Sequence, residues 1–239
     1  MLGIYEANFQ FSAKGGLTIF TFRRCRVEPH HIAAGGSASD PCHLGHYALV
    51  AAVIKSGLFD EVRWVVSGTR FDKLLTASPD DRIATSIQTF PREWHEPNRR
   101  PQFKIDFENA AETNMPTIEY LEQLQSRHSH ADITWFTGSD VLVPHEELGG
   151  KCQMETWIQG KELMQSWRFL VLPRESYPHP STLGLPSNFT ILDIKIHNFS
   201  SSYIREQIKN GKVFEHMLSH DVVKYIKERG LYGWKGQSI

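Results

Sequence analysis

The sequence predicts an α/β protein: a doubly wound parallel sheet with helices on both faces, preceded by an N-terminal β-hairpin extension. From about residue 32 onward, short apolar segments with strand character alternate with amphipathic helical segments, which is typical of a parallel sheet covered on both sides. Three of the helical segments end at a glycine, Gly57, Gly211 or Gly230, and one has a strong polar start at Ser78. The 239-residue chain holds no run of about 18 apolar residues, so no transmembrane helix is expected.

The first element is a hairpin over residues 7–23, where Phe9 and Phe11 alternate with polar residues and Lys14-Gly15-Gly16 supplies a turn. We therefore expect residues 1–28 to form an N-terminal extension and residues 29–239 to form the main domain.

The main domain is expected to open with an apolar strand at 32–34 that stops at a turn made by Gly35 and Gly36. The clearest helix start is Ser78-Pro79, which supplies an N-cap serine and a proline at the first helical position. The remaining strands are predicted at 62–66, 103–107, 133–136, 169–172 and 191–196. The helices are predicted at 45–56, from 79 onward, and at 117–125, 201–210 and 219–229.

Composition limits the class of partner. The chain has 26 basic and 27 acidic residues, a balance that argues against nucleic acid as the main partner but allows a small phosphorylated ligand. Three cysteines without tight spacing make no disulfide framework, and the N-terminus lacks the pattern of a signal peptide. We expect a cytoplasmic protein without membrane attachment, and the sequence leaves open whether it forms a homo-oligomer.

The most informative segment runs from Gly35 to His46 and reads GGSASDPCHLGH. Its glycines let backbone N–H groups face a ligand without a Cβ in the way. His43 and His46 flank Gly45 where a helix begins, and a helix start attracts anions through its N–H groups and dipole. Two imidazoles added there suit a polyphosphate, because they can donate hydrogen bonds to charge that develops in phosphoryl transfer.

Three other interpretations of this segment remain open. Cys42, His43 and His46, with His30 and His31, carry metal-ligating groups, although their spacing matches no common zinc pattern. Cys42 beside His43 could act as a nucleophile, although adjacency in sequence does not establish a Cys–His pair in space. The third interpretation is an ordinary turn with surface histidines.

A second segment, FSSSYIR from Phe199 to Arg205, opens a helix directly after the last predicted strand. Its serine hydroxyls and N–H groups, with Arg205 one turn inside the helix, predict a second anion cradle. The alternative is simple N-capping by Ser200 or Ser201.

Together, His43-x-Gly45-His46 and Ser201-Ser202-x-x-Arg205 resemble the motifs of the HxGH nucleotidyltransferase superfamily. Within it the chain looks most like the nicotinate/nicotinamide mononucleotide adenylyltransferases. The resemblance covers roughly residues 32–232. Further matches are WFTGSD at 135–140, LVLPR at 170–174, the helix from 222 that ends near Leu231-Tyr232, and the substrate-loop Lys73 with Arg82 opening the next helix.

The resemblance implies a Rossmann-like fold and an enzyme of dinucleotide cofactor synthesis. Its substrates would be ATP and a pyridine mononucleotide, joined with release of pyrophosphate. The attacking phosphate is already an anion, so positioning and charge stabilisation carry the reaction without a general base. Mg²⁺ is expected to come with ATP, held mainly by substrate oxygens and water.

The resemblance also implies roles for individual residues. Catalytic contacts to the ATP phosphates fall to His43, His46 and Arg205. Nucleotide binding falls to Gly35, Gly36, Ser37, Gly45, Gly138, Asp140, Ser201 and Ser202. Acceptor binding falls to Lys73, Thr117, Trp157 and Arg174. On this basis, His46→Ala is expected to slow turnover with folding unchanged.

Several of these roles have alternatives. Asp140 is expected to hold a ribose hydroxyl or the nucleotide–metal unit, or else to form an Asx turn or N-cap. Arg174 is expected at the mononucleotide phosphate or the adenine edge, or else in solvent. Trp157 is expected to stack on the pyridine, or else to belong to the core.

Three departures from the family pattern leave the acceptor open. Ser39 stands where the family has an aromatic residue, and Phe71-Asp72 stands where it has Pro-His. Met115-Pro116-Thr117 replaces a Ser-Tyr-Thr run, and Pro116 has no N–H to offer a pyridine carboxylate. The alternatives are another phosphorylated acceptor, such as phosphopantetheine or an alcohol phosphate, and a nucleotide-binding sensor without turnover.

Overall fold

The computed structural model describes residues 5–8, 21–24, 30–68, 75–111 and 115–236. Its centre is a six-stranded sheet in the order β10-β9-β6-β3-β4-β5, and every neighbouring pair is parallel. The strands are β3 (His30–Ser37), β4 (Glu61–Val66), β5 (Gln102–Asp106), β6 (Ala131–Gly138), β9 (Arg168–Leu172) and β10 (Phe189–Ile191). The predicted doubly wound α/β fold is confirmed.

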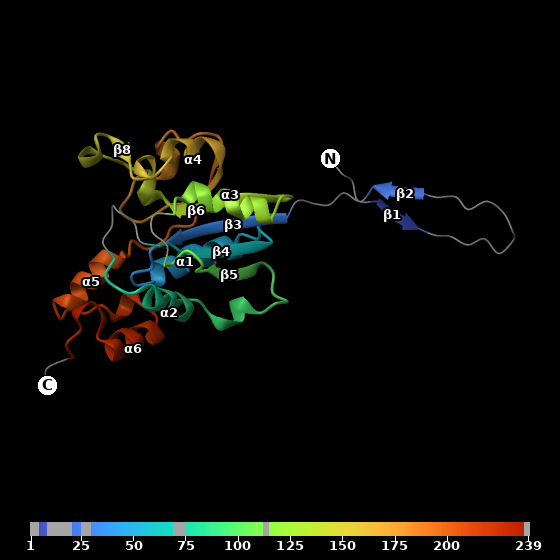
Figure 1. The fold of residues 1–239 in the computed structure, drawn as a ribbon. Helices are drawn as coiled ribbons and strands as arrows, with labels where there is room; N and C mark the ends of the chain where they lie inside the picture. Colours follow the sequence, from blue (N-terminus) through green and yellow to red (C-terminus); the bar gives the residue numbers. More distant parts are fainter. Residues whose placement is uncertain (1–4, 9–20, 25–29, 69–74, 112–114, 237–239) are drawn as a thin grey trace.

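Helices cover both faces of this sheet (Figure 1). α1 (Leu44–Lys55) and α2 (Pro79–Thr89) lie on one face, and α3 (Thr117–Arg127) and α4 (Gly160–Ser166) lie on the other. α5 (Ser201–Lys209) and α6 (His220–Arg229) form a separate cluster with its own buried core. Two strands of two residues each, β7 (Pro144–His145) and β8 (Lys151–Cys152), pair antiparallel and lie between β6 and α4 in the chain.

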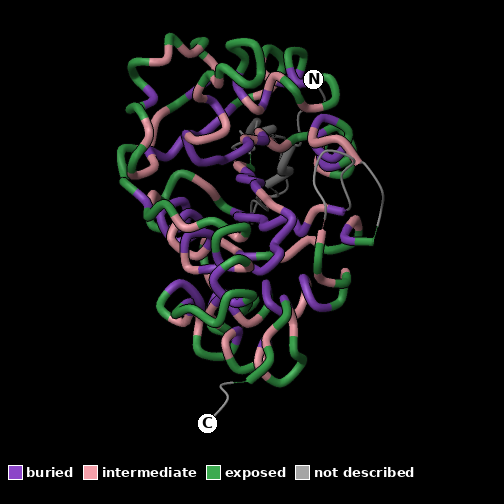
Figure 2. Tube along the Cα trace, turned by 90° about the vertical axis from the view of Figure 1, so that its left-hand side faces the viewer, coloured by how far each residue is buried: buried purple, intermediate pink, exposed green. Residues whose placement is uncertain are grey.

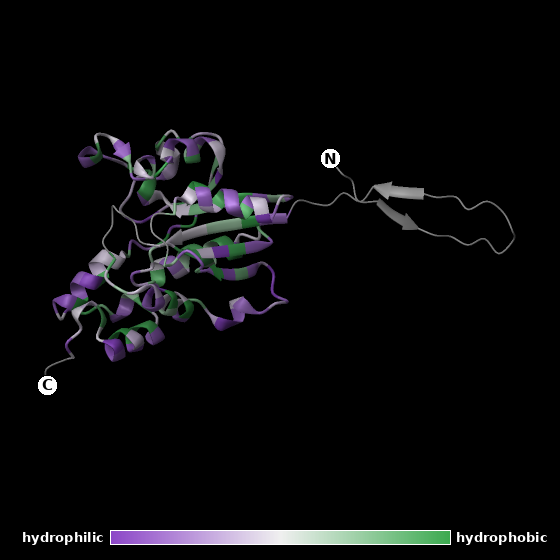
Figure 3. Ribbon diagram, in the orientation of Figure 1, coloured by the Kyte–Doolittle hydropathy of each residue, from purple (hydrophilic) through white to green (hydrophobic). Residues whose placement is uncertain are grey.

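Burial follows the layers. Buried residues run along the strands and the inner sides of the helices, while exposed residues lie on the outer loops (Figure 2). The hydropathy of the chain shows hydrophobic stretches along the sheet, mixed with hydrophilic residues in β4 and β5, and mainly hydrophilic residues in loops and outer helices (Figure 3). Alternation along β4 explains the two cores: Val62 and Trp64 pack towards α1, while Val65 packs with the residues of α3.

Local capping chemistry fixes the helix ends as predicted. Ser78 caps α2 by accepting a hydrogen bond from the Asp81 N–H at 3.2 Å, with Pro79 at the first position. Ser219 caps α6 in the same way, and Gly230 ends it in the left-handed conformation at φ 62°.

Three expectations need correction. β3 does not stop before the glycines but continues through Gly35 and Gly36 to Ser37. The strand expected at 191–196 is instead β10 at 189–191, and only Ile196 makes a further bridge, to Arg174. α4 was not expected, because its seven residues are too few to show a helical period.

At the N-terminus, β1 (Tyr5–Asn8) pairs antiparallel with β2 (Thr21–Arg24), which agrees with a hairpin although its strands start and end elsewhere than expected. The connecting residues 9–20 and the expected domain boundary at residues 28 and 29 lie outside the described residues, so the division into two parts stays a prediction. Within the described ranges, no helix has the length and apolar character to cross a membrane.

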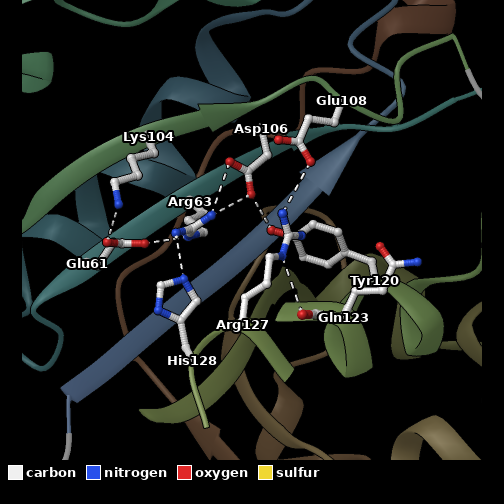
Figure 4. Close-up of polar contacts among 9 residues, drawn as sticks. All are labelled: Glu61, Arg63, Lys104, Asp106, Glu108, Tyr120, Gln123, Arg127 and His128. Carbon is white, nitrogen blue, oxygen red and sulfur yellow. Dashed lines mark hydrogen bonds and ion pairs between the residues drawn. The ribbon is translucent and has the colours of Figure 1, made fainter. Parts of the chain in front are cut away.

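The face of β4 and β5 beneath α3 is polar (Figure 4). Glu61 accepts hydrogen bonds from Arg63 and, at 2.7 Å, from Lys104. Arg63 pairs with Asp106 at 3.1 Å, and Tyr120 on α3 donates its hydroxyl to the same carboxylate at 2.6 Å. Burial alone would raise the pKa of Glu61, but Lys104 and Arg63 hold it below its usual value. This network joins the start of α3 to the sheet.

Candidate active site

The site residues gather where the strand order reverses. From β3 the chain moves to β4 and β5 on one side, and from β6 it moves to β9 and β10 on the other. Ligands of such sheets bind beyond the carboxyl ends of the strands at this reversal. Ser37 ends β3 and Gly138 ends β6, so the GGSASDPCHLGH segment and the GSD turn lie at the expected place.

The two histidines form the N-terminal cap of α1. His43 is the N-cap residue, and its Nδ1 accepts from the Gly45 N–H at 3.1 Å. Nδ1 of His46 in turn accepts from the His43 N–H at 3.3 Å, which completes a capping box. Because Nδ1 accepts in both rings, the ring proton of each lies on Nε2.

The histidine rings are packed as one unit. They stack with centroids 3.7 Å apart and 16° between their planes, and His46 also lies 4.9 Å from the Trp64 ring. Nε2 of His46 lies 3.1 Å from the Ser37 Oγ and donates to it in this tautomer. Both imidazoles are buried, so the site holds two N–H donors whose orientation is set by the fold before any ligand arrives.

The start of α5 docks against the same loop, although it lies far away in the sequence. Ser201 donates its hydroxyl to the Pro41 carbonyl at 3.0 Å, and Arg205 donates to the Asp40 carbonyl at 2.6 Å. The Arg205 guanidinium also lies 3.2 Å from the Ser202 Oγ. Ser200 is the N-cap of α5, as the alternative interpretation had it, while Ser201 and Arg205 bring the two motifs side by side.

The glycines of the GGSASDPCHLGH segment are also needed for packing, because a side chain at these positions would meet neighbouring atoms. A Cβ on Gly35 would lie 2.5 Å from the Phe136 ring, and one on Gly36 would overlap the backbone of Val65 on β4. A Cβ on Gly45 would lie 3.0 Å from the His43 ring. The predicted Gly-Gly turn is therefore wrong: these two glycines let the central strands approach their neighbours.

Asp140 and Arg174 form an ion pair across Gly138. Arg174 Nη1 lies 3.1 Å from the Asp140 Oδ2, and a Cβ on Gly138 would lie 2.5 Å from Asp140 and 3.0 Å from Arg174. The Arg174 side chain is mostly buried, and the backbone N–H of Arg174 donates to the Ser139 hydroxyl at 3.0 Å. Arg174 is therefore not a solvated surface residue.

Comparison with known proteins agrees with this geometry. A protein from Frankia alni named "Probable nicotinate-nucleotide adenylyltransferase" is 30% identical over 206 residues, which cover 82% of this chain and 97% of that protein. The chain belongs to the nicotinate-nucleotide adenylyltransferase family. A protein of the same name from Corynebacterium kroppenstedtii is 28% identical over 212 residues, covering 84% of this chain and 90% of the other. A scan against models of protein families finds no match.

A solved structure supports the fold. The Plasmodium falciparum nicotinic acid mononucleotide adenylyltransferase complexed with NaAD matches with a TM-score of 0.70 at 17% identity. The match covers 86% of this chain and 98% of that one. At this identity the likeness establishes the Rossmann-like fold, and the resemblance drawn from the sequence motifs is confirmed.

The residues expected to bind the acceptor are gathered less closely than those expected to hold the ATP phosphates. Thr117 is the first residue of α3 and is half-buried. Trp157 is half-buried and packs against the core beneath α3, together with Met115. Lys73 lies outside the described residues.

Sequence reasoning missed Asp40, which is fully buried at the centre of the adenylyltransferase site. Its carboxylate accepts from the Thr76 N–H at 2.8 Å and the Ala77 N–H at 3.1 Å, and lies 3.6 Å from Arg205. An acidic residue inside the glycine–histidine segment was the available signal, but its partners are distant in sequence.

The rival interpretations of Cys42 lose support. Burial raises the pKa of the Cys42 thiol to about 12, so it is a neutral thiol and a poor nucleophile. Among the described residues, no group of three or more His, Cys, Asp or Glu side chains is arranged to hold a metal ion. The histidines cap a helix in the interior, so they are not surface residues of an ordinary turn.

Proposed function

We propose that this protein transfers AMP from ATP to nicotinate mononucleotide, forming a pyridine dinucleotide and releasing pyrophosphate. The observation that carries the proposal is the convergence of the capped histidine pair and the start of α5 at the reversal of the strand order. The curated relatives named nicotinate-nucleotide adenylyltransferase support the choice of acceptor.

The reaction requires charge stabilisation more than proton transfer. A phosphate oxygen of the mononucleotide forms a bond to the α-phosphorus of ATP, and the bond from that phosphorus to the oxygen bridging to the β-phosphate breaks. The electron pair leaves with pyrophosphate. We assign the Nε2–H group of His43 to the charge that develops on the leaving phosphates. We assign that of His46 to the same charge once its hydrogen bond to the Ser37 hydroxyl is exchanged for one to a phosphate oxygen. Ser201, Ser202 and Arg205 hold the β- and γ-phosphates at the start of α5.

The donor set of this site fits Mg²⁺ that arrives bound to ATP. Both carboxylate oxygens of Asp40 accept backbone N–H groups, and Asp140 is paired with Arg174. The oxygens around the ion would therefore be mainly those of the polyphosphate and water. When bound, Mg²⁺ neutralises phosphate charge and favours departure of pyrophosphate.

The acceptor side is assigned to the turn after β6 and the start of α3. Gly35, Gly36 and Ser37 border the junction of the two substrates, and Gly45 lies under the phosphates. Asp140 and Arg174, with Gly138 beneath them, face a ribose or a phosphate. Thr117, Trp157 and Lys73 are assigned to the pyridine nucleotide. The N-cap residue of α3, Pro116, offers no side-chain cap, so the first N–H groups of the helix suit a pyridine carboxylate.

The test is pyrophosphate release by purified protein with Mg-ATP and either nicotinate mononucleotide or nicotinamide mononucleotide. Turnover with the nicotinate form, at least tenfold above the nicotinamide form, is expected from a carboxylate held at a helix start, about the effect of one charge-assisted hydrogen bond. Preference for nicotinamide would contradict the assignment at α3. No turnover with either would overturn the proposal, and a panel of other phosphorylated acceptors would then test the alternative raised by Pro116.

A further inference from the structure

Arg82, on the first turn of α2, is buried although it carries a charge. The residue is 1% exposed, and among the described residues the hydrogen bonds of its guanidinium go to main-chain carbonyls and not to a carboxylate. Burial lowers the pKa of the guanidinium, and the charge of Asp40 opposes this shift. A buried charge needs partners, and here the partners are main-chain carbonyls.

These carbonyls belong to three different loops. Nη1 donates to the Ala38 carbonyl at 2.8 Å and to the Ser67 carbonyl at 2.5 Å, and Nη2 donates to the Ala110 carbonyl at 2.5 Å. Ala38 follows β3, Ser67 follows β4, and Ala110 follows β5. One planar group thus joins the loops at the carboxyl ends of three adjacent strands, which is the edge where the site lies.

Two of the three loops continue in the sequence to residues that are expected to bind the acceptor. The loop from Ser67 leads towards the expected acceptor residue Lys73, and the loop from Ala110 leads to Thr117 at the start of α3. The third, at Ala38, lies beside Ser37, which contacts His46. The ATP phosphates are instead assigned to the start of α5. None of the three hydrogen bonds of Arg82 given above goes to α5.

We infer that Arg82 is a positioning residue that fixes the acceptor-binding loops of the site, and so sets acceptor affinity without touching a substrate. The expected effect on acceptor affinity rests on the proposed function. The hydrogen bonds from Arg82 to the three loops are independent of it. Lysine cannot replace arginine here, because a single ammonium cannot reach three carbonyls with the planar geometry of a guanidinium.

The test compares Arg82→Lys with Arg229→Lys. Arg229 is the matched control, because it also contacts the first turn of α2, through Asp81 at 3.3 Å. Its side chain is 58% exposed, and this ion pair involves no loop of the site. Arg82→Lys is expected to raise the KM for nicotinate mononucleotide at least about tenfold and to change the KM for ATP by less than about threefold, since small misplacements of binding groups have effects of this size. Arg229→Lys is expected to leave both KM values unchanged.

A second measurement needs no turnover. Hydrogen exchange followed by mass spectrometry is expected to speed up in peptides that contain Ser67 and Ala110 in Arg82→Lys, while peptides from the middle of α2 keep the wild-type rate. If wild-type protein shows no turnover, the proposed function fails while the exchange experiment still decides the role of Arg82.

Three results would overturn the inference. One is a folded Arg82→Lys variant with wild-type KM values and wild-type exchange at the two loops. Another is an equal rise of both KM values together with faster exchange throughout α2, which would indicate general loosening. The third is failure of both Arg82→Lys and Arg82→Gln to fold, which would make Arg82 a residue of global stability.

Discussion

His46→Ala removes the two hydrogen bonds that one imidazole makes through its two nitrogens, together with its ring packing against His43 and Trp64. Nδ1 accepts from the His43 N–H, and Nε2 donates to Ser37. Loss of a helix N-terminal capping interaction costs about 1 kcal/mol, which lowers the Tm of a chain of this length by about 2–4 °C. Loss of a preorganised donor to developing charge lowers kcat by about 10²–10³. The sequence-based expectation of unchanged folding is therefore replaced by a modest loss of stability.

Two further variants separate these effects. Asparagine places an amide oxygen close to the position of Nδ1, whereas glutamine places an amide N–H close to the position of Nε2. His46→Asn keeps an acceptor for the His43 N–H but loses the ring packing, so it is expected to keep a higher Tm than His46→Ala while losing about 10²–10³ in kcat. His46→Gln is expected to lose about 1 kcal/mol of stability and to keep most of its activity.

The assay is pyrophosphate release at saturating Mg-ATP and nicotinate mononucleotide, with urea unfolding measured on the same preparations. His220→Ala is the control, because that side chain is 93% exposed at the start of α6, away from the histidine pair. A wild-type rate in His46→Ala would remove the proposed charge stabilisation. If the asparagine and glutamine variants lost activity and stability in parallel, the separation of roles between the two nitrogens would be refuted.

Three other changes test the structure at separate places. Gly36→Ala puts a Cβ into the backbone of the adjoining strand and is expected to cost about 3 kcal/mol or more in urea unfolding; a wild-type midpoint would contradict the strand assignment. Tyr120→Phe deletes a buried hydroxyl donating to Asp106 at 2.6 Å and should cost about 1.5–3 kcal/mol, with an unchanged midpoint as the contrary result. Burial, and then the charge of Arg63, hold the pKa of His128 below its usual 6.5, so its contribution to stability is present above pH 6.5 and is lost on acidification towards the folded-state pKa. His128→Gln is expected to reduce the fall in unfolding free energy between pH 7 and 5, and an identical pH dependence would count against this assignment.

The helix ends could be predicted from the sequence because capping is local chemistry. Ser78 with Pro79, and Ser219 with Gly230, act within a few residues of themselves, so the chain alone specifies them. The histidine segment was also correctly placed at a helix start after the first strand, and its exact hydrogen bonds follow from that position.

What could not be predicted depends on contacts between distant residues. Gly35 and Gly36 suggest a turn when only their neighbours in sequence are considered. Their place in a central strand follows from Phe136 on β6 and Val65 on β4, which leave no room for a Cβ. Asp40 was missed for the same reason, and Arg82 was matched to the family pattern without a role, because their partners come from loops after other strands.

The two sides of the site are held by different means, and this bears on how the chain departs from its family. On the phosphate side, α6 is fixed to both ends of α2, through Tyr225 donating to Asp81 at 2.9 Å and Ser219 donating to the Gln88 carbonyl at 2.9 Å. α5 shares a buried core with α6 and bonds directly to the histidine segment, so any change there disturbs several packed elements at once. The acceptor loops are instead held by their main chain, whose carbonyls bond to arginine whatever side chains the loops carry. Side chains on those loops can therefore vary while these main-chain bonds persist, which agrees with the departures expected at 71–72 and 115–117 beside the histidine motif and the α5 start.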